Sequence, residues 1–242
     1  MRLAVVSDIH SNLHALEAVL ADIRTEAPDE LVCLGDLVGY GPQPNECVEA
    51  IFDHAAISLC GNHDLAVLGE IDVADFSGDA GIAARWTRGV LHESQAEWLR
   101  SLTPTGEHAG AQLFHGSPRD PIWDYVLSED AARASMLATT AALVLVGHSH
   151  VALALGWDGK EITGGLAPAG TEIELAGHRW LLNPGSVGQP RDGDPRAAWL
   201  LIDDAAGRAS FRRVTYPIDQ AQAAIRARGL PDTLAARLAH GV

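Results

Sequence analysis

The sequence predicts an α/β (α+β) fold in which a parallel β-sheet packs against a second, more mixed sheet. Over residues 1–102, short apolar runs alternate with helical patterns, and this alternation is typical of parallel sheets. After residue 102, strand-like runs follow one another and are separated by glycine, proline and aspartate. Because no linker or low-complexity stretch divides the two halves, we expect a single domain over residues 1–242.

The predicted strands are short apolar runs bounded by turn-forming residues. The earliest ones alternate with helices, whereas the later ones lie close together in the second half of the chain. They cover residues 3–6, 31–34, 55–59, 111–115, 142–146, 151–155, 171–175, 179–183, 197–202 and 208–216.

The predicted helices show apolar residues at helical spacing. The first ends before Pro28, and the others cover 44–54, 79–102, 128–139 and 218–239, the last of them broken at residues 229–231. The residues expected to pack inward are Leu13, Leu16, Leu20 and Ile23 in the first helix and Trp86, Val90, Trp98 and Leu99 in the third.

The chain of 242 residues has a globular composition, with 47% hydrophobic and 20% charged residues, which excludes disordered and collagen-like classes. Lysine and arginine number 17 against 32 aspartates and glutamates, so the net charge is −15. This charge argues against bulk binding to nucleic acid or to anionic membrane surfaces. No apolar run approaches the roughly 20 residues of a membrane span. A small phosphorylated substrate stays compatible if a local positive charge attracts it.

The three cysteines, Cys33, Cys47 and Cys60, form no CxxC pair, and two of them stand in apolar runs. We expect buried free thiols, which are typical of a reducing compartment. The N-terminal run MRLAVVSD meets an acidic residue at position 8, too early for a secretory signal peptide. Both observations predict a cytoplasmic protein.

Five segments share one pattern, an apolar strand followed by Asp, His or Asn. Each alone has an ordinary explanation, because such residues often form turns after a strand. Five together are poorly explained by coincidence, and the carboxyl ends of parallel strands meet at one edge of a sheet. The segments are Ser7-Asp8-Ile9-His10, Gly35-Asp36, Gly61-Asn62-His63-Asp64, His115-Gly116 and Gly147-His148-Ser149-His150.

The side chains in these segments suit divalent metal ions. Carboxylate, imidazole and amide oxygen are ligands for manganese, iron, nickel and zinc, and no cysteine takes part. Asp8 and His10 share one face of a strand, and His148 and His150 repeat that geometry. The donors exceed what one ion takes, whereas two ions that share a carboxylate use them all. Two ions about 3.5–4 Å apart hold a phosphoryl group and activate a bridging water.

The ordered set DxH, GD, GNHD, H and GHxH resembles the calcineurin-like metallophosphoesterases, and within them the small bacterial and archaeal phosphodiesterase-like members. The motifs run from Asp8 to His150, and the segment NPGS at 183–186 extends the likeness over most of the chain. The resemblance implies two β-sheets packed face to face with helices outside, a four-layer αββα sandwich. This agrees with the parallel and mixed halves predicted from the residues.

The resemblance also implies two divalent metal ions as cofactors. We expect manganese, and iron, nickel or zinc suit the same donors. The implied ligands are Asp8, His10 and His150 for the first ion, Asn62, His115 and His148 for the second, and Asp36 as a bridge between both.

His63 is implied to be a catalytic group that protonates the leaving oxygen or holds the phosphate. In the protein phosphatase branch, the motif GDxxDRG supplies an acid that orients this histidine and an arginine that grips a phosphomonoester. Here Gly39 and Tyr40 stand at those two positions, which argues against a phosphoserine phosphatase. The small loop at 39–41 leaves room for a second ester group. Asp64 is a candidate to orient His63, although adjacent side chains rarely face each other.

Four further residues have two interpretations each. Tyr40, Trp123 and Tyr125 either line a substrate pocket or pack as ordinary aromatic residues. Arg191 either reaches the phosphate or forms a surface ion pair with the aspartate at 192 or 194.

The sequence therefore predicts a binuclear metal-dependent phosphodiesterase that cleaves small phosphate diesters, with a metal-bridging hydroxide as nucleophile. Asp36 and His63 are the residues on which this chemistry depends. A nucleotide-pyrophosphate hydrolase, a phosphatase or a nuclease could use the same site, and a non-catalytic scaffold could share the fold. A small phosphate ester is the expected partner, and a homo-oligomer is compatible with the sequence.

Overall fold

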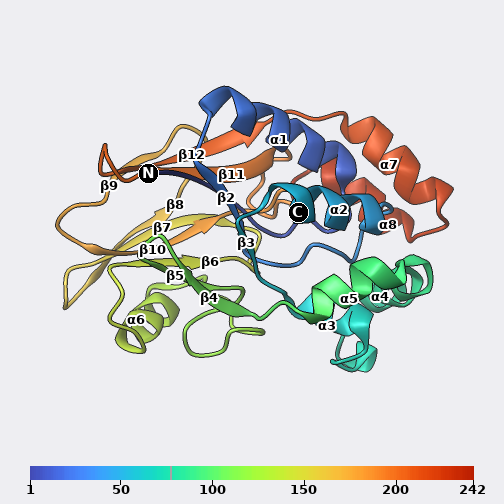
Figure 1. Ribbon diagram of the computed structural model, residues 1–242, viewed down its shortest axis with the longest axis horizontal. Coiled ribbons are helices and arrows are strands. Elements are labelled where there is room, and N and C mark those ends of the chain that lie inside the picture. The colour runs from blue at the N-terminus through green and yellow to red at the C-terminus, as the bar shows by residue number, and fades with distance from the viewer. Residues whose placement is uncertain (77) are drawn as a thin grey trace.

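Two six-stranded β-sheets packed face to face form the centre of the computed structural model, which describes residues 1–76 and 78–242 (Figure 1). Helices lie outside both sheets, so the molecule has four layers. This arrangement confirms the predicted sandwich of two mixed sheets flanked by helices. The helices on the outer side of the first sheet are α1 (Leu13–Glu26), α2 (Pro44–His54), α7 (Ile218–Ala227) and α8 (Asp232–Ala236), and α6 (Glu129–Leu137) covers the second sheet.

The first sheet joins strands from both ends of the chain in the order β3-β2-β1-β11-β12-β9. The first three strands are parallel, as predicted, but β11 pairs with β1 in the antiparallel direction. The pattern over residues 1–102 predicts a parallel first sheet, and this part of the prediction is wrong. The apolar strand β11, from the second half of the chain, pairs with the free side of β1 and makes the sheet mixed. The strands are β1 (Arg2–Val6), β2 (Glu30–Cys33), β3 (Ile57–Ser58), β9 (Glu172–Glu174), β11 (Ala197–Asp203) and β12 (Arg208–Val214).

The second sheet has the order β4-β5-β6-β10-β7-β8 and mixes both directions. Its two edge strands, β4 and β8, lie outside every predicted strand. They carry glycine and polar residues, as in the sequence ITGGL of β8, so their propensity is low and pairing with a neighbour defines them. The strands are β4 (Thr105–His108), β5 (Ala111–Phe114), β6 (Leu143–Val146), β7 (Ala152–Trp157), β8 (Ile162–Leu166) and β10 (Arg179–Pro184).

The helix expected over 79–102 is two helices, α4 (Gly78–Val90) and α5 (Glu93–Arg100). The chain breaks between them because the backbone N–H of His92 donates to Asn45 Oδ1 at 2.7 Å, a contact with a distant segment. Val90 was expected to pack inward, but it is 37% exposed beside this break, whereas Leu99 is fully buried.

Further short helices go beyond the sequence pattern. Helix α3 (Asn62–Leu68) begins inside the GNHD motif, and the turns η1 (Val73–Asp75) and η2 (Arg237–Ala239) follow α3 and α8. The predicted break in the C-terminal helical segment is confirmed, because α7 and α8 are separate helices.

Three apolar clusters fill the three interfaces between the four layers. Along β1, Leu3 and Val5 face the second sheet, while Ala4 and Val6 face the helices above the first sheet. Each strand alternates its side chains between faces, so a strand buried on both sides must be apolar throughout. The third cluster lies under α6 and includes Met136. These layers hold the strand ends in fixed positions.

The three cysteines are buried and free, as predicted. Among the helices that the structure describes, none has the length and apolar character needed to cross a membrane.

Leu200 on β11 is fully buried between the two sheets, so its truncation tests the interface that holds them together. We expect Leu200→Ala to lower the free energy of unfolding by about 2–5 kcal/mol, because the cavity left between rigid sheets closes only in part. Leu137→Ala is the control, since Leu137 is 67% exposed and its loss should change stability by less than about 0.5 kcal/mol. Urea unfolding compares both variants, and equal losses would contradict this assignment of the core.

Candidate metal centre

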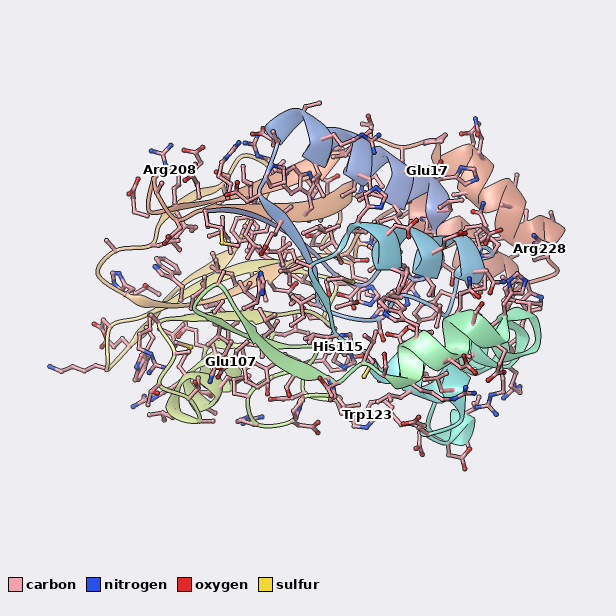
Figure 2. All side chains as sticks on the ribbon, in the orientation of Figure 1. Glu17, Glu107, His115, Trp123, Arg208 and Arg228 are labelled. Atoms are coloured by element: carbon pink, nitrogen blue, oxygen red, sulfur yellow. The ribbon has the colours of Figure 1, made fainter. Side chains whose placement is uncertain are left out.

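The predicted polar residues converge at one edge of the sandwich because the strands that precede them end there. Asp8 follows β1, Asp36 follows β2 and His115 follows β5. The backbone N–H of His148, after β6, donates to Asp8 Oδ2 at 3.1 Å and so links the two sheets. Figure 2 labels His115 where the two layers of strands meet. The sequence pattern of strand followed by polar residue therefore describes a real cluster.

The first group of donors consists of Asp8, His10, Asp36 and His150, all buried, with one donor atom from each within 4.8 Å of the others. Two of the imidazole rings are fixed by backbone carbonyl groups. His10 Nδ1 donates to the Val38 carbonyl at 3.1 Å, and His150 Nδ1 donates to the Gln189 carbonyl at 2.7 Å. A carbonyl oxygen only accepts, so in each ring the proton is on Nδ1 and the lone pair is on Nε2.

The two Nε2 atoms of His10 and His150 lie 3.0 Å apart. Burial lowers the pKa of both rings well below the usual value, so both are neutral and their lone pairs face each other. Two lone pairs at this distance repel unless a cation lies between them. The arrangement therefore fits a divalent ion, for which neutral imidazole nitrogen is a preferred ligand.

The second group consists of Asp36, His115 and His148, again buried and within 4.8 Å. His115 Nδ1 donates to the Leu34 carbonyl at 2.9 Å, and its Nε2 lies 3.2 Å from Asn62 Oδ1. His148 Nε2 is buried and has no hydrogen-bond partner among the described residues. A buried nitrogen without a partner is costly, and a metal ion would satisfy it.

Asp36 belongs to both groups. Its Oδ2 lies 3.5 Å from His10 Nε2 in one group and 3.5 Å from His115 Nε2 in the other. Among the described residues neither this oxygen nor Asp8 Oδ1 has a hydrogen-bond partner. The other oxygen, Oδ1, accepts from the backbone N–H of His63 at 2.9 Å, which fixes the carboxylate. The donor set thus fits two ions that share this carboxylate.

Burial and charge act differently on the buried ionisable groups. Burial raises the pKa of Asp8 to about 7, and the Asp36 carboxylate adds to this rise while the His115 ring opposes it. Burial would raise the pKa of Asp36 as well, but the His115 and His63 rings hold it well below the usual value. Burial would lower the pKa of His115, yet the Asp36 and Asp8 carboxylates raise it to about 9. Of these two carboxyl groups, Asp36 therefore has the lower pKa.

His63 lies beside the first group, with its ring centre 4.4 Å from Tyr40 and 4.8 Å from Phe76. A side chain on Gly39 would place its Cβ 2.7 Å from His63 Nδ1, and Gly39 has a φ of +89°, so glycine is required there. Burial lowers the pKa of His63 to about 4. The ring is therefore held by packing against Tyr40, Phe76 and the backbone of Gly39, while the backbone N–H of His63 is fixed by Asp36.

Asp64 does not orient His63. Its two carboxylate oxygens accept from the backbone N–H groups of Val38 at 3.0 Å and Gly61 at 2.9 Å. It therefore joins the loop after β2 to the start of α3. The candidate assignment made from the sequence is wrong because the carboxylate turns away from the neighbouring ring to cap its own helix.

The backbone is strained at the proposed ligands. Five of them have positive φ values, among the nine such non-glycine residues in the described chain. Left-handed conformations cost non-glycine residues energy and cluster at functional sites. The tight turns they form let two side chains of one short motif point at the same place. The five are Asp8 (54°), His10 (50°), Asp36 (53°), His148 (63°) and His150 (59°).

The aromatic and cationic residues left open by the sequence also lie at this edge. Arg191 Nη2 donates to Tyr40 Oη at 3.3 Å and to Gln189 Oε1 at 2.9 Å, and its guanidinium lies over the Tyr40 ring. Tyr125 stacks on the His148 ring at 4.0 Å. The alternative of a surface ion pair for Arg191 is wrong, because the neighbouring aspartates bind other arginines.

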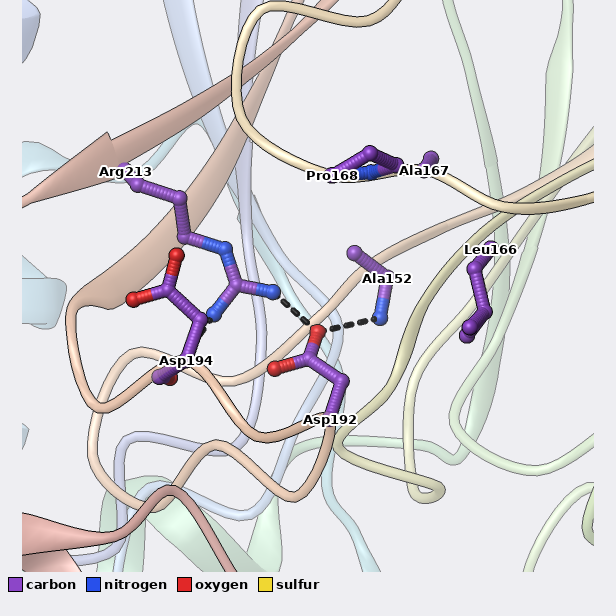
Figure 3. Close-up of a pocket in the computed structure, with 7 residues that line it drawn as sticks. All are labelled: Ala152, Leu166, Ala167, Pro168, Asp192, Asp194 and Arg213. Atoms are coloured by element: carbon purple, nitrogen blue, oxygen red, sulfur yellow. Dashed lines mark hydrogen bonds and ion pairs between the residues drawn. The ribbon is translucent and has the colours of Figure 1, made fainter.

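A buried ion pair holds the loop that carries Arg191 (Figure 3). Asp192 contacts Arg213 of β12, and the two side chains are only 8% and 2% exposed. Asp192 also accepts from the backbone N–H of Ala152 at 3.3 Å, directly after the motif that contains His150. A cavity of about 130 Å³ adjoins the pair. The sequence does not predict this ion pair, because only folding brings residues 192 and 213 together.

The calcineurin-like phosphoesterase superfamily domain matches residues 1–205, and this chain belongs to that family of phosphoester hydrolases. The family is metal-dependent, and the buried Asp and His groups described above could hold its metal.

Proteins similar to this chain come from bacteria and archaea. A metallophosphoesterase of Sphaerobacter thermophilus has 40% sequence identity and a TM-score of 0.91, with 100% of this chain and 99% of that chain covered. An uncharacterized protein of Methanocaldococcus jannaschii is 38% identical over 241 residues, which is 98% of this chain and 96% of the relative. A hypothetical protein of Pyrococcus horikoshii shares the fold at 20% identity, with a TM-score of 0.79 and 100% and 98% coverage.

Substitution of Arg213 tests the buried ion pair between Asp192 and Arg213. We expect Arg213→Met to lower the free energy of unfolding by about 3–5 kcal/mol, because it leaves Asp192 buried without its cation. Arg208→Met on the same strand is the matched control, since its pair with Glu172 is exposed and should contribute less than about 1 kcal/mol. Urea unfolding gives both values. The double variant Asp192→Asn/Arg213→Met should recover part of the loss, and a loss equal to the single variant's would argue against the pair.

Proposed function

We propose that this chain hydrolyses small phosphate diesters at a centre of two divalent metal ions. The observation that supports this best is the position of Asp36 Oδ2, which is 3.5 Å from an imidazole nitrogen of each donor group. Asp8, His10 and His150 would hold one ion, and Asn62, His115 and His148 the other. Asp36 would bridge them. We further propose manganese as the ion, because these oxygen and imidazole donors suit it.

When bound, such ions neutralise phosphoryl oxygens and lower the pKa of water to about 7. The protein's own residues then divide the remaining work. Backbone carbonyl groups keep the imidazole lone pairs turned inward, as at Val38 and Gln189. The backbone of His63 is held beside Asp36, and its ring would hydrogen-bond to a phosphate oxygen. The negative charge of that phosphate would raise the low pKa of the ring, which would let it give a proton to the leaving oxygen.

Two features support a diester over a monoester. Gly39 and Tyr40 stand where the protein phosphatase branch of the family carries the acid and the arginine that binds a phosphomonoester. The nearby cation, Arg191, instead comes from the loop after β10, and its Nε is buried without a partner among the described residues. An arginine can hydrogen-bond to the two non-bridging oxygens of a phosphate diester and leave its two ester oxygens free.

A nucleotide-pyrophosphate hydrolase is the second candidate. A segment of 71 residues, 28% of this chain and 26% of the relative, is 38% identical to a symmetrical bis(5'-nucleosyl)-tetraphosphatase of Thioalkalivibrio sulfidiphilus. Both reactions would use the same donor groups and the same histidine. They would differ in the group attached to the phosphate, which the residues around the metal centre must accommodate.

Hydrolysis of bis(p-nitrophenyl) phosphate beside p-nitrophenyl phosphate tests the proposal. Protein stripped of metal receives manganese, iron, nickel or zinc in turn, and release of p-nitrophenol is followed. We expect metal-dependent cleavage that favours the diester, and a loss of about 10²- to 10⁴-fold in His63→Ala with unchanged metal content. Folded protein that cleaves neither ester with any ion would contradict the proposal and favour a scaffold.

Asp36→Asn tests the shared carboxylate. Because the bridge supplies an oxygen to each group, we expect this variant to lose affinity for both ions and to lose turnover. Asp53→Asn, an exposed change on α2, is the control and should keep both ions. Metal content after dialysis is measured by inductively coupled plasma mass spectrometry. Full metal content together with undiminished activity in Asp36→Asn would rule out the bridging role.

A further inference from the structure

The rim of the metal centre carries aromatic side chains whose positions the proposed reaction does not by itself explain. Tyr125 stacks on the ring of His148, with the ring centres 4.0 Å apart and an angle of 23° between the planes. Tyr125 is nevertheless 46% exposed, so packing covers only part of its surface. Tyr125 thus stacks on a residue of the second donor group and is partly exposed to solvent.

A second series of aromatic contacts begins at His63. Phe76 lies 4.8 Å from the His63 ring, and Trp123 lies 5.6 Å from Phe76. Trp123 is 39% exposed and comes from the same loop as Tyr125, between β5 and α6. In Figure 2, Trp123 lies toward the surface from His115. The loop therefore carries one exposed ring stacked on His148 and another that contacts Phe76, which packs against His63.

The loop that presents these rings is braced rather than loose. Asp120 Oδ1 accepts from the backbone N–H groups of Ile122 and Trp123 at 3.0 Å each. Ser117 Oγ donates to Asp124 Oδ2 at 2.6 Å. Along this fixed course Trp123 and Tyr125 are exposed, Asp124 between them is half-buried and Val126 is buried. A rigid loop that keeps large apolar rings in water is typical of a preformed binding surface.

We propose that Trp123 and Tyr125 form a stacking surface for a nucleobase, so that the diesters cleaved here are esters of nucleosides. The inference rests on the proposed function, because the phosphate of such a substrate must lie at the two donor groups. Stacking on an aromatic ring accepts any base, since every base has a flat π-face. Arg191 and the bound ions would then attract the phosphate while the rim selects the group attached to it.

Two substrates with the same leaving group isolate this preference. Thymidine 5'-(p-nitrophenyl phosphate) and methyl p-nitrophenyl phosphate both release p-nitrophenol, but only the first carries a base. With manganese-loaded protein, we expect kcat/KM for the nucleoside ester to exceed that for the methyl ester by about tenfold or more. A ratio near one would overturn the inference and leave the phosphodiesterase proposal intact.

Variants of the rim separate stacking from apolar contact. Tyr125→Leu and Trp123→Leu keep an apolar side chain but remove the ring, so the ratio of kcat/KM for the nucleoside ester to that for the methyl ester should fall toward one. Tyr125→Phe keeps the ring and should keep the ratio. Phe52→Leu is a matched control, since Phe52 is 61% exposed on α2 and packs against Trp98, in another part of the fold. Equal ratios in Tyr125→Leu and the unmodified protein would contradict a role for this ring.

A binding measurement makes the inference independent of turnover. Calorimetry compares thymidine 5'-phosphate with methyl phosphate on the manganese-loaded protein. We expect the nucleotide to bind about tenfold more tightly and this advantage to be lost in Tyr125→Leu. Tighter nucleotide binding without hydrolysis of either diester would support the stacking surface and contradict the proposed function. Equal affinities would overturn the stacking surface.

Discussion

The carboxylate of Asp36 is the constraint on which the arrangement of the centre depends. One oxygen is fixed by the backbone N–H of His63, and the other lies midway between two groups of imidazoles. For this to happen, β1, β2 and the strands of the second sheet must end at one edge, and residue 61 must be glycine, since a Cβ there would collide with the carboxylate. The four-layer packing serves this geometry by holding strand ends from two sheets in place.

Much of the fold was predictable because local sequence patterns indicate its strands and helices. Apolar runs that end in Asp, His or Asn identified the strands at the centre, where burial on both faces demands continuous apolar sequence. The edge strands β4 and β8 were missed because their glycines have little strand propensity and only pairing defines them. The break before α5 was missed because a distant side chain, Asn45, causes it. The single domain, the cytoplasmic location and the homo-oligomer stay predictions.

The side chains of the centre were predictable, but what holds them was not. Five motifs at strand ends predict the donor residues. The groups that orient the imidazole rings are backbone carbonyls, which every residue has, so no sequence motif indicates them. The hydrogen-bond partner of Arg191 was also not predictable from the sequence. Its sequence neighbours are aspartates, yet Asp192 binds Arg213 and Asp194 binds Arg196, so Arg191 turns to Tyr40. Such choices depend on long-range competition among several arginines for a few buried carboxylates.

The facing imidazole nitrogens of His10 and His150 have a consequence for the stability of the native state. Without a cation between them, their repulsion acts on two turns that already have left-handed backbone, so both features destabilise this edge of the native state. An ion bound between these nitrogens would remove the repulsion and stabilise both turns. Because such an ion binds the native state and not the unfolded chain, the free energy of unfolding would rise with its concentration.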